Sequence, residues 1–423
     1  MTVGISFIGL LLVGLPISLT LATLALIYIV VSGNTVLLQS YPQQMFGGLE
    51  SYGMLALPLF ILLGEFMNAG GIGRRLMAFA LALLGPMRGG LAYVNLGANM
   101  MMASILGSTV AQITIMSRLA VPEMERAGYP KDVSVAITAA GGLLAPIIPP
   151  SMMFIIFGVI AQVPIGDMFI AGIVPGILIF LAFCGLIGWQ AYRHDFPRNP
   201  GMSMQERSRA VVDALPAALI PGSIIASILG GFATPTEAAT VASLLAVLIG
   251  MFVYREMTLA DIWPALLNAG RGAAVVLFLI AAAQVFSWVI TFENLPARVA
   301  AYMSGLTDSP IVFLLMLNLL LLGLGMITDP IPAIILVVPV FLPVATEVYG
   351  IDPIHFGVVL CLNLTLGLVT PPVGTGLFTA SLLTGVRAER IAWLLLPFLA
   401  VAGVVVLLIV LWPAIALGLV RGF

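Results

Sequence analysis

Residues 133–166 read VSVAITAAGGLLAPIIPPSMMFIIFGVIAQVPIG and residues 353–386 read PIHFGVVLCLNLTLGLVTPPVGTGLFTASLLTGV, and neither stretch contains Asp, Glu, Lys or Arg. As a straight helix of about 1.5 Å per residue, each would be roughly 50 Å long, whereas the apolar core of a bilayer is about 30 Å thick. Each stretch has a central cluster of Gly and Pro, and proline removes a backbone donor and clashes with the preceding helical turn. We therefore expect two broken helices, 131–163 and 353–386, each interrupted near mid-membrane.

The composition of the whole chain agrees with a membrane protein. Hydrophobic residues make up 61% of the 423 positions and charged residues only 8%, with a mean hydropathy of +1.18. Soluble domains have about 45 to 50% and about 25% respectively. The formal net charge is −2, which argues against a nucleic-acid partner. The two cysteines, Cys184 and Cys361, lie in apolar stretches without metal-ligand spacing, so we expect small core residues there.

Other charge-poor runs predict straight transmembrane helices. These runs are Val3–Val31, 52–70, 168–192, 214–232, 238–254, 272–292 and 391–420. The connector 32–51 is too polar to span a bilayer and could lie along the interface.

Two more stretches predict re-entrant helical hairpins. Residues 89–127 form an apolar run with a small polar patch at its centre, made of Ser104, Gly107, Ser108 and Thr109. Residues 309–348 form the matching hairpin, with its tip at Gly325–Pro332.

Positive charge predicts the orientation of the chain. The loop 193–209 carries Arg193, Arg198, Arg207 and Arg209, which the positive-inside rule assigns to the cytoplasm. Counting spans in both directions then places Arg74, Arg75, Arg88, Arg255, Arg271, Arg387 and Arg390 inside as well. The same count puts the N-terminus inside and the C-terminus outside.

The chain also repeats itself weakly. Pro122 matches Pro343 at an offset of 221, Gly128 matches Gly350 at 222, and Gly142 and Pro146 match Gly367 and Pro371 at 225. Coincidence is the alternative, because Gly and Pro are frequent in membrane helices.

The repeat predicts the domain organisation. A first half (1–192) is followed by a cytoplasmic loop and linking helix (193–235) and a second half (236–423). The extra helix 214–232 reverses the second half, giving an all-α polytopic membrane protein with an inverted-topology repeat, which is typical of secondary transporters. Substrate and ion then bind where the broken helices of the two halves meet.

Asp329 is the first candidate binding residue. It lies in the second hairpin tip, between 20 uncharged residues before it and 17 after it. A lone carboxylate at the bilayer centre usually faces a polar cavity and has a partner, here a sodium ion or a proton. The alternative is an N-cap of a helix beginning at Pro330, and both roles can hold together.

Hydroxyl groups at the tips and breaks are the other candidates. Ser104, Ser108 and Thr109 in the first half, and Thr328, Thr370 and Thr375 in the second, offer oxygen ligands that suit a hard cation. Each hydroxyl by itself could equally serve helix packing, as could the amides of Asn99 and Asn363.

Other polar residues favour structural roles. Arg118 could snorkel from the base of the first hairpin, and Glu237 follows Thr234–Thr236 as in a helix N-terminal cap. The histidines, His194 and His355, have no catalytic partner in the sequence. No Walker loop, Gly-x-Ser-x-Gly elbow or His-Glu-x-x-His pattern is present, so we expect no enzyme and no cofactor.

Three long stretches resemble one transporter family. Val121–Pro150 (VPEMERAGYPKDVSVAITAAGGLLAPIIPP), Thr234–Ala239 (TPTEAA) and Gly350–Gly376 (GIDPIHFGVVLCLNLTLGLVTPPVGTG) are similar to the large membrane (M, DctM-like) subunit of tripartite ATP-independent periplasmic (TRAP) transporters. The resemblance covers essentially the whole chain.

The resemblance implies an elevator-type, sodium-coupled importer of an organic acid, with both hairpins and both broken helices in a mobile domain. It also implies a bacterial inner-membrane location, a separate small four-helix membrane subunit and a periplasmic binding protein. The implied sodium ligands are Ser104, Gly107, Ser108, Ala145, Gly325, Asp329, Gly367 and Thr370. For the substrate we expect Ser108, Thr109, Pro149, Ser151, Thr328 and Thr375.

One tip departs from the family pattern. The family usually has Ser-Gly-Ser-Ala followed by Ala-Asp at the first hairpin, whereas this chain has Leu106, Gly107, Ser108 and Thr109, then Ala111 and Gln112. The substrate stays open among sialic acids, four-carbon dicarboxylates and other organic acids. A stand-alone sodium and anion symporter of the same fold is the alternative function. A channel would need a continuous polar stripe through several helices, and an intramembrane enzyme would need a paired nucleophile and base; we find neither in the sequence.

Overall fold

The computed structural model describes the chain except for residues 1–5, 7, 8, 11, 12, 86, 199–202 and 423. Within the described part the chain is helical, and its one extended pairing is an isolated bridge between Arg88 and Arg198. The elements in order are α2 (Ile17–Val31), α3 (Leu37–Gly47), η1 (Tyr52–Leu55), α4 (Ala56–Ala69), α5 (Ile72–Leu84), α6 (Gly90–Leu106), α7 (Thr109–Arg126), α8 (Lys131–Gly142), α9 (Met152–Ile160), α10 (Ile165–Arg193), α11 (Met204–Leu229), α12 (Pro235–Leu248), η2 (Ile249–Val253), α13 (Leu259–Phe292), α14 (Leu295–Leu306), α15 (Pro310–Ile327), α16 (Pro330–Pro343), η3 (Val344–Val348), α17 (Pro353–Gly367), α18 (Thr375–Thr384), α19 (Ala388–Leu411) and α20 (Ala414–Arg421).

Both predicted hairpins are confirmed. Helices α6 and α7 form hairpin 1, and α15 with α16 and η3 forms hairpin 2. Gly107 ends α6 with a φ of 57°, a left-handed conformation that favours glycine. At hairpin 2, Asp329 caps α16 and Pro330 fills its first position, where no backbone donor is needed.

Both predicted broken helices are confirmed as well. Residues 143–151 separate α8 from α9, and residues 368–374 separate α17 from α18. Each break contains a Pro–Pro pair with a cis peptide bond, Pro149–Pro150 and Pro371–Pro372.

The repeat extends over more of the chain than its Gly and Pro matches indicate. Helices α6 to α10 begin 220 to 223 residues before α15 to α19, taken pair by pair, and α5 begins 223 residues before α14. The match of Gly142 with Gly367 holds, because these residues end α8 and α17. The match of Pro146 with Pro371 is wrong. The residue pair that corresponds to Pro371–Pro372 is Pro149–Pro150, because each pair lies just before the second helix of its broken helix, α18 or α9. The first break is longer than the second, which shifts the register between the two halves.

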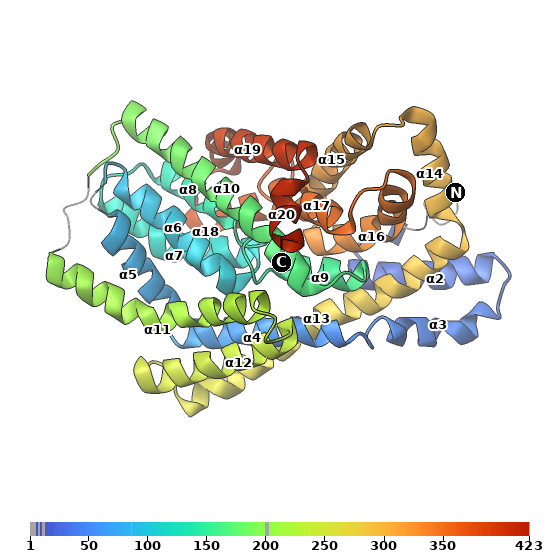
Figure 1. Cartoon of the computed structure of the whole chain (residues 1–423), viewed down its shortest axis with the longest axis horizontal. Helices are drawn as coiled ribbons and strands as arrows, with labels where there is room; N and C mark the ends of the chain where they lie inside the picture. The colour runs from blue at the N-terminus through green and yellow to red at the C-terminus, as the bar shows by residue number, and fades with distance from the viewer. Residues whose placement is uncertain (1–5, 7–8, 11–12, 86, 199–202, 423) are drawn as a thin grey trace.

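The helices form two groups (Figure 1). A scaffold, which we define as α2, α3, α4, α11, α12 and α13, lies along one side, with α4 packed on α12 and α13. A core group, α6 to α10 and α15 to α20, lies on the other. Helices α5 and α14 connect the groups at opposite ends of the molecule.

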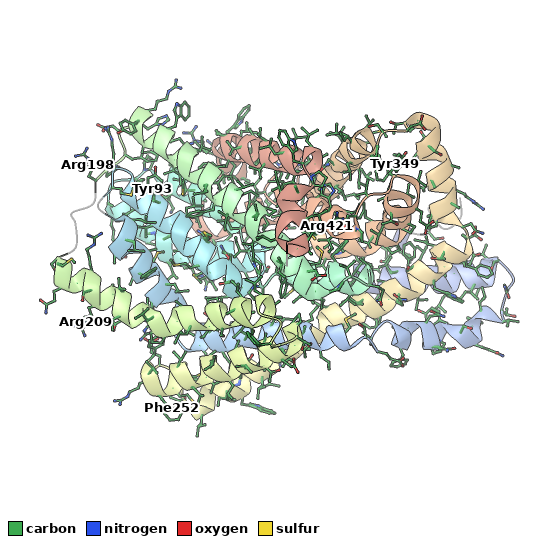
Figure 2. All side chains as sticks on the ribbon, in the orientation of Figure 1. Tyr93, Arg198, Arg209, Phe252, Tyr349 and Arg421 are labelled. Carbon is green, nitrogen blue, oxygen red and sulfur yellow. The ribbon has the colours of Figure 1, made fainter. Side chains whose placement is uncertain are left out.

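The two hairpins enter from opposite ends. Gly89, at the base of hairpin 1, donates a backbone hydrogen bond of 3.3 Å to Pro197 O, and Arg198 and Arg209 mark this basic end (Figure 2). Tyr349, at the base of hairpin 2, lies at the other end (Figure 2). This opposition is what an inverted repeat requires.

Several predicted spans have other boundaries in the structure. Helix α2 of the first span begins only at Ile17, because a turn at residues 13–14 and Pro16 precede it. Residues 6, 9 and 10 before the turn are also helical, and residues 3–5, 7, 8, 11 and 12 lie outside the described part. The span 272–292 belongs to the 34-residue α13, and the span 391–420 divides into α19 and α20 at Trp412–Pro413.

Helices α5 and α14 are not among the predicted elements: Arg74 and Arg75 of α5 are assigned to a connector, and residues 293–308 belong to no predicted span or hairpin. Helix α5 meets α4 at a bend of 70°. By length and composition, the described chain has seven helices that could cross a membrane, or eight if this bent pair forms one span.

Candidate functional site

The tip of hairpin 1 lies against the first helix break. A Cβ built on Gly107 would be 3.3 Å from Met152 N and 3.6 Å from Pro150 O. Ser108 follows with an extended backbone and precedes the first turn of α7. The close approach and the positive φ of Gly107 both favour glycine at this position.

The tip of hairpin 2 lies against the second break in the same way. A Cβ on Gly325 would be 2.9 Å from Leu364 O and 3.1 Å from the Cα of Gly367. Gly374 N donates a hydrogen bond of 3.0 Å to Met326 O. Each hairpin tip therefore packs on the break of its own repeat.

Helices of the two repeats also contact each other. Helix α7 packs on α18 of the other repeat, and α16 packs on α9. The four segments meet around a cavity of about 50 Å³, which we call the tip cavity. It is lined by Gly107, Ser108, Thr109, Val110, Pro146, Met152, Met153, Asp329, Pro330, Ile331 and Leu368.

The tip cavity carries oxygen atoms and helix N-termini. Asp329 is exposed, and its Oδ1 accepts a hydrogen bond of 3.0 Å from Ile331 N. Thr109 Oγ1 is buried and has no hydrogen-bond partner in the described structure. Hydroxyl and carboxylate oxygens can hold a hard cation, and the positive ends of α7 and α16 attract an anion. The volume suits a small ion rather than an organic acid.

The other predicted ion ligands lie around this cavity without lining it. Ser104 Oγ donates to Met101 O at 2.8 Å, and Thr370 Oγ1 donates to Leu366 O at 2.6 Å. Ala145 is fully buried inside the first break. Gly325 and Gly367 provide the close packing described above.

The predicted substrate residues divide in a similar way. Ser108 and Thr109 line the tip cavity, whereas Pro149, Ser151, Thr328 and Thr375 do not. Ser151 Oγ donates to Pro146 O at 2.5 Å and caps α9, and Thr328 Oγ1 donates to Leu324 O at 3.0 Å. Thr375 Oγ1 is buried with no partner among the described residues.

A larger cavity of about 260 Å³ adjoins the first tip, and we call it the scaffold cavity. It shares Gly107, Ser108 and Met152 with the tip cavity, and its opposite wall comes from α4. Ligand pockets usually measure about 300 to 1,000 Å³, so this cavity approaches the size needed for a small organic acid.

Sequence reasoning missed two polar residues of that wall, Glu65 and Asn68. Asn268 Nδ2 of α13 donates a hydrogen bond of 3.4 Å to Glu65 Oε2. A usable signal existed, because Glu65 is the only charged residue between Glu50 and Arg74, with 14 uncharged residues before it and 8 after it.

The unusual Gln112 is directed into hairpin 1 itself. Its Nε2 donates to the backbone oxygen and to Oδ1 of Asn99 at 2.7 and 2.9 Å. Asn99 donates to Asn95, and Asn95 donates to Thr138 of α8 at 2.7 Å. Asn99 and Gln112 therefore join α6 and α7 to each other and to α8.

Comparison with known proteins gives consistent results. A family model described as the DctM component of the tripartite ATP-independent periplasmic transporter matches residues 5–415. The 2,3-diketo-L-gulonate TRAP transporter large permease protein YiaN of Escherichia coli is 41% identical over 79% of this chain and 79% of its own length. The sialic acid TRAP transporter large permease protein SiaM of Vibrio cholerae is 34% identical over 97% of this chain and 96% of its own.

Two further matches extend the comparison. The isethionate TRAP transporter permease protein DctMQ of Oleidesulfovibrio alaskensis is 38% identical over 96% of this chain, which spans 64% of that longer protein. The crystal structure of the Alcanivorax borkumensis YdaH transporter superposes with a TM-score of 0.65 at 15% identity, covering 92% of this chain and 90% of that one. That likeness concerns the fold alone.

Proposed function

This chain belongs to the DctM family of tripartite ATP-independent periplasmic transporters, and we propose that it carries an organic acid into the cell together with sodium ions. The observation that carries the proposal is the meeting of both hairpin tips and both helix breaks around the tip cavity, next to a cavity of nearly ligand size. Inverted-repeat transporters bind substrate and coupling ion at such meeting points.

Sodium is the proposed occupant of the tip regions. Asp329 provides a carboxylate that reaches the tip cavity, and Ser108 and Thr109 provide hydroxyls on its other side. Unwound carbonyls near Ala145 and Thr370 complete the proposed ligand sets. A cation there would neutralise Asp329 and offset the cost of a charge at this depth.

The proposed substrate site is the scaffold cavity beside Ser108. The positive end of α7 would attract the carboxylate, while Glu65 and Asn68 on α4 would contact the rest of the molecule. The named substrates of the relatives are organic acids of different size, two of them carboxylates and one, isethionate, a sulfonate.

Movement of the core group against the scaffold would alternate access to this site. Helices α5 and α14 connect the two groups and would act as its arms. We propose the bacterial inner membrane as the location, with a small four-helix subunit and a periplasmic binding protein as partners. If the purified chain alone catalysed uptake, the stand-alone symporter would replace this proposal.

A sodium titration of thermal unfolding tests the proposal without a known substrate. In detergent at constant ionic strength, sodium at 100 times its dissociation constant should stabilise the protein by about 2.7 kcal/mol, whereas potassium should not. Asp329→Asn should weaken the response while keeping the fold, because asparagine also caps helices. Asp308→Asn, at the base of the same hairpin, is the matched control and should respond like the wild type. A folded protein with no sodium-specific response would refute sodium coupling.

A further inference from the structure

A third cavity continues from the scaffold cavity along hairpin 1. It measures about 450 Å³ and lies between hairpin 1 and the corner where α4 meets α5. Its charged lining residues are Arg74, Arg118 and Glu256, and we call it the basic cavity because the two arginines outnumber the carboxylate. It shares Asn68, Ile105, Leu106 and Ile115 with the scaffold cavity, so the two are neighbours with common walls.

Arg118 is the uncompensated charge of this cavity. Arg74 pairs with Glu256, and Arg75 pairs with the same carboxylate at 2.8 Å. Arg118 is exposed and makes neither an ion pair nor a side-chain hydrogen bond with any described residue.

Arg118 lies at the middle of α7. It follows Thr109, the first residue of α7, by nine positions, which corresponds to about 14 Å along the helix from the tip. It also lies eight residues before the end of α7 at Arg126. A tip near mid-membrane places Arg118 close to the edge of the roughly 30 Å apolar core, where its long side chain can reach both the basic cavity and the interface.

We propose that Arg118 is a transient binding station for the carboxylate of the substrate, on a path between the hairpin 1 tip and the basic end of the molecule. This role for Arg118 rests on the proposed function, the uptake of an organic acid. A guanidinium holds a carboxylate through two parallel hydrogen bonds, and Asn68, in both cavities, offers an amide donor between Ser108 and Arg118. The substrate anion would then meet a polar donor in each successive cavity.

Charged thiol reagents test the attraction for anions without a transport assay. In a background with Cys184→Ala and Cys361→Ala, each reagent's rate with Asn68→Cys is divided by its rate with a free thiol in solution. This normalised rate should be higher for anionic sulfonatoethyl methanethiosulfonate than for the trimethylammonium reagent. Adding Arg118→Gln should lower this rate ratio by about ten-fold, the lower limit of typical electrostatic focusing in a cleft. Leu319→Cys, an exposed apolar position on α15 that we expect to face lipid, is the control and should react poorly with both reagents. An unchanged ratio would mean that Arg118 is engaged elsewhere, for example by lipid phosphate, and would overturn the proposal.

Uptake measurements test the role in transport. The full transporter in proteoliposomes is assayed with 2,3-diketo-L-gulonate, sialic acid, isethionate and succinate. For the acid that the wild type takes up, Arg118→Gln should lower the initial rate about ten-fold, and Arg118→Lys should restore part of it. Arg126→Gln, on the same helix but paired with Glu123, should stay within about two-fold. Wild-type uptake rates in the Arg118→Gln variant would overturn the role proposed for Arg118. If the wild type itself showed no sodium-dependent uptake, that result would count against the proposed function. The thiol-reagent experiment would then decide the role of Arg118.

Discussion

At the scale of single residues, glycine determines how closely each hairpin tip approaches its break. A Cβ on Gly367 would lie 2.4 Å from the carbonyl carbon of Gly325, and a Cβ on Gly325 would meet Leu364 O at 2.9 Å. Backbone atoms cannot move aside as a flexible side chain can. Both glycines, which the family resemblance implies as sodium ligands, therefore set the spacing between the segments that would supply ion ligands.

Two glycines on the same helix allow a controlled test of this spacing. Gly325→Ala should destabilise the protein by about 1 to 3 kcal/mol, because the added methyl group overlaps the backbone of α17. Gly323→Ala, with nothing within 4 Å of its Cβ, should instead be neutral or stabilising by up to about 1 kcal/mol. Denaturant or thermal unfolding of both variants measures the difference, and equal stabilities would contradict the argument.

At the scale of elements, α5 and α14 are the connections between scaffold and core group. Gly71, with a φ of 66°, makes the turn from α4 to α5. Arg74 and Arg75 in the first turn of α5 then bind Glu256, which lies in the short loop between η2 and α13. The ring of Tyr254 stacks under Arg75 at 3.7 Å. These contacts fix the start of α5 to the scaffold.

The Glu256 cluster predicts a pH-dependent contribution to stability. Partial burial raises the pKa of Glu256, but its hydrogen bonds to Arg75 and Arg74 outweigh burial and hold the pKa below the ordinary value. The stabilisation is then complete above about pH 4.3 and is lost as the pH falls through the lower, folded value. Glu256→Gln should lower stability at pH 7 by less than about 1 kcal/mol, since the pair is partly exposed.

Thermal unfolding from pH 7 to pH 3.5 measures this contribution. The difference between wild type and Glu256→Gln should shrink at the acid end. Glu123→Gln, which removes a more exposed pair within one helix, should show a smaller difference throughout. A difference that grows as the pH falls would contradict the assigned sign.

At the scale of the whole molecule, the core group contacts the scaffold through few elements. Helix α4 touches α6 and α9, α13 touches α16, and α11 touches α10. At one of these contacts, a Cβ on Gly64 of α4 would lie 3.1 Å from Ile105 O of α6. Relative movement of the two groups must break this contact.

Cross-linking tests whether transport needs that movement. In the background without native cysteines, the pair Gly64→Cys and Ile105→Cys, joined by a short thiol-specific linker, should stop uptake, and reductive cleavage of the linker should restore it. The pair Gly48→Cys and Gln284→Cys joins α3 to α13 within the scaffold, where a Cβ on Gly48 would lie 2.7 Å from that of Gln284, and should leave uptake unchanged. Full activity with the first link in place would exclude the elevator movement.

The sequence by itself determined the membrane class, both hairpins, both broken helices and the repeat. These features follow from local chemistry, because clustered Gly and Pro interrupt helices and a charge-free run of about 20 residues or more has the length and composition of a membrane span. The cap of α12 is equally local: Thr234 and Glu237 bind each other's backbone donors, as the spacing predicts.

Only the tertiary structure decided which polar groups share a cavity. It brought Asp329 to Ser108 across the repeat, directed Gln112 into hairpin 1, and placed Glu65 and Arg118 on cavity walls. It also showed that α5 and α14 are helices and that the second Pro–Pro pair matches Pro149–Pro150. The physical reason is that a helix apolar on all sides carries no stripe that reveals its neighbours, so its contacts depend on packing between segments far apart in the chain.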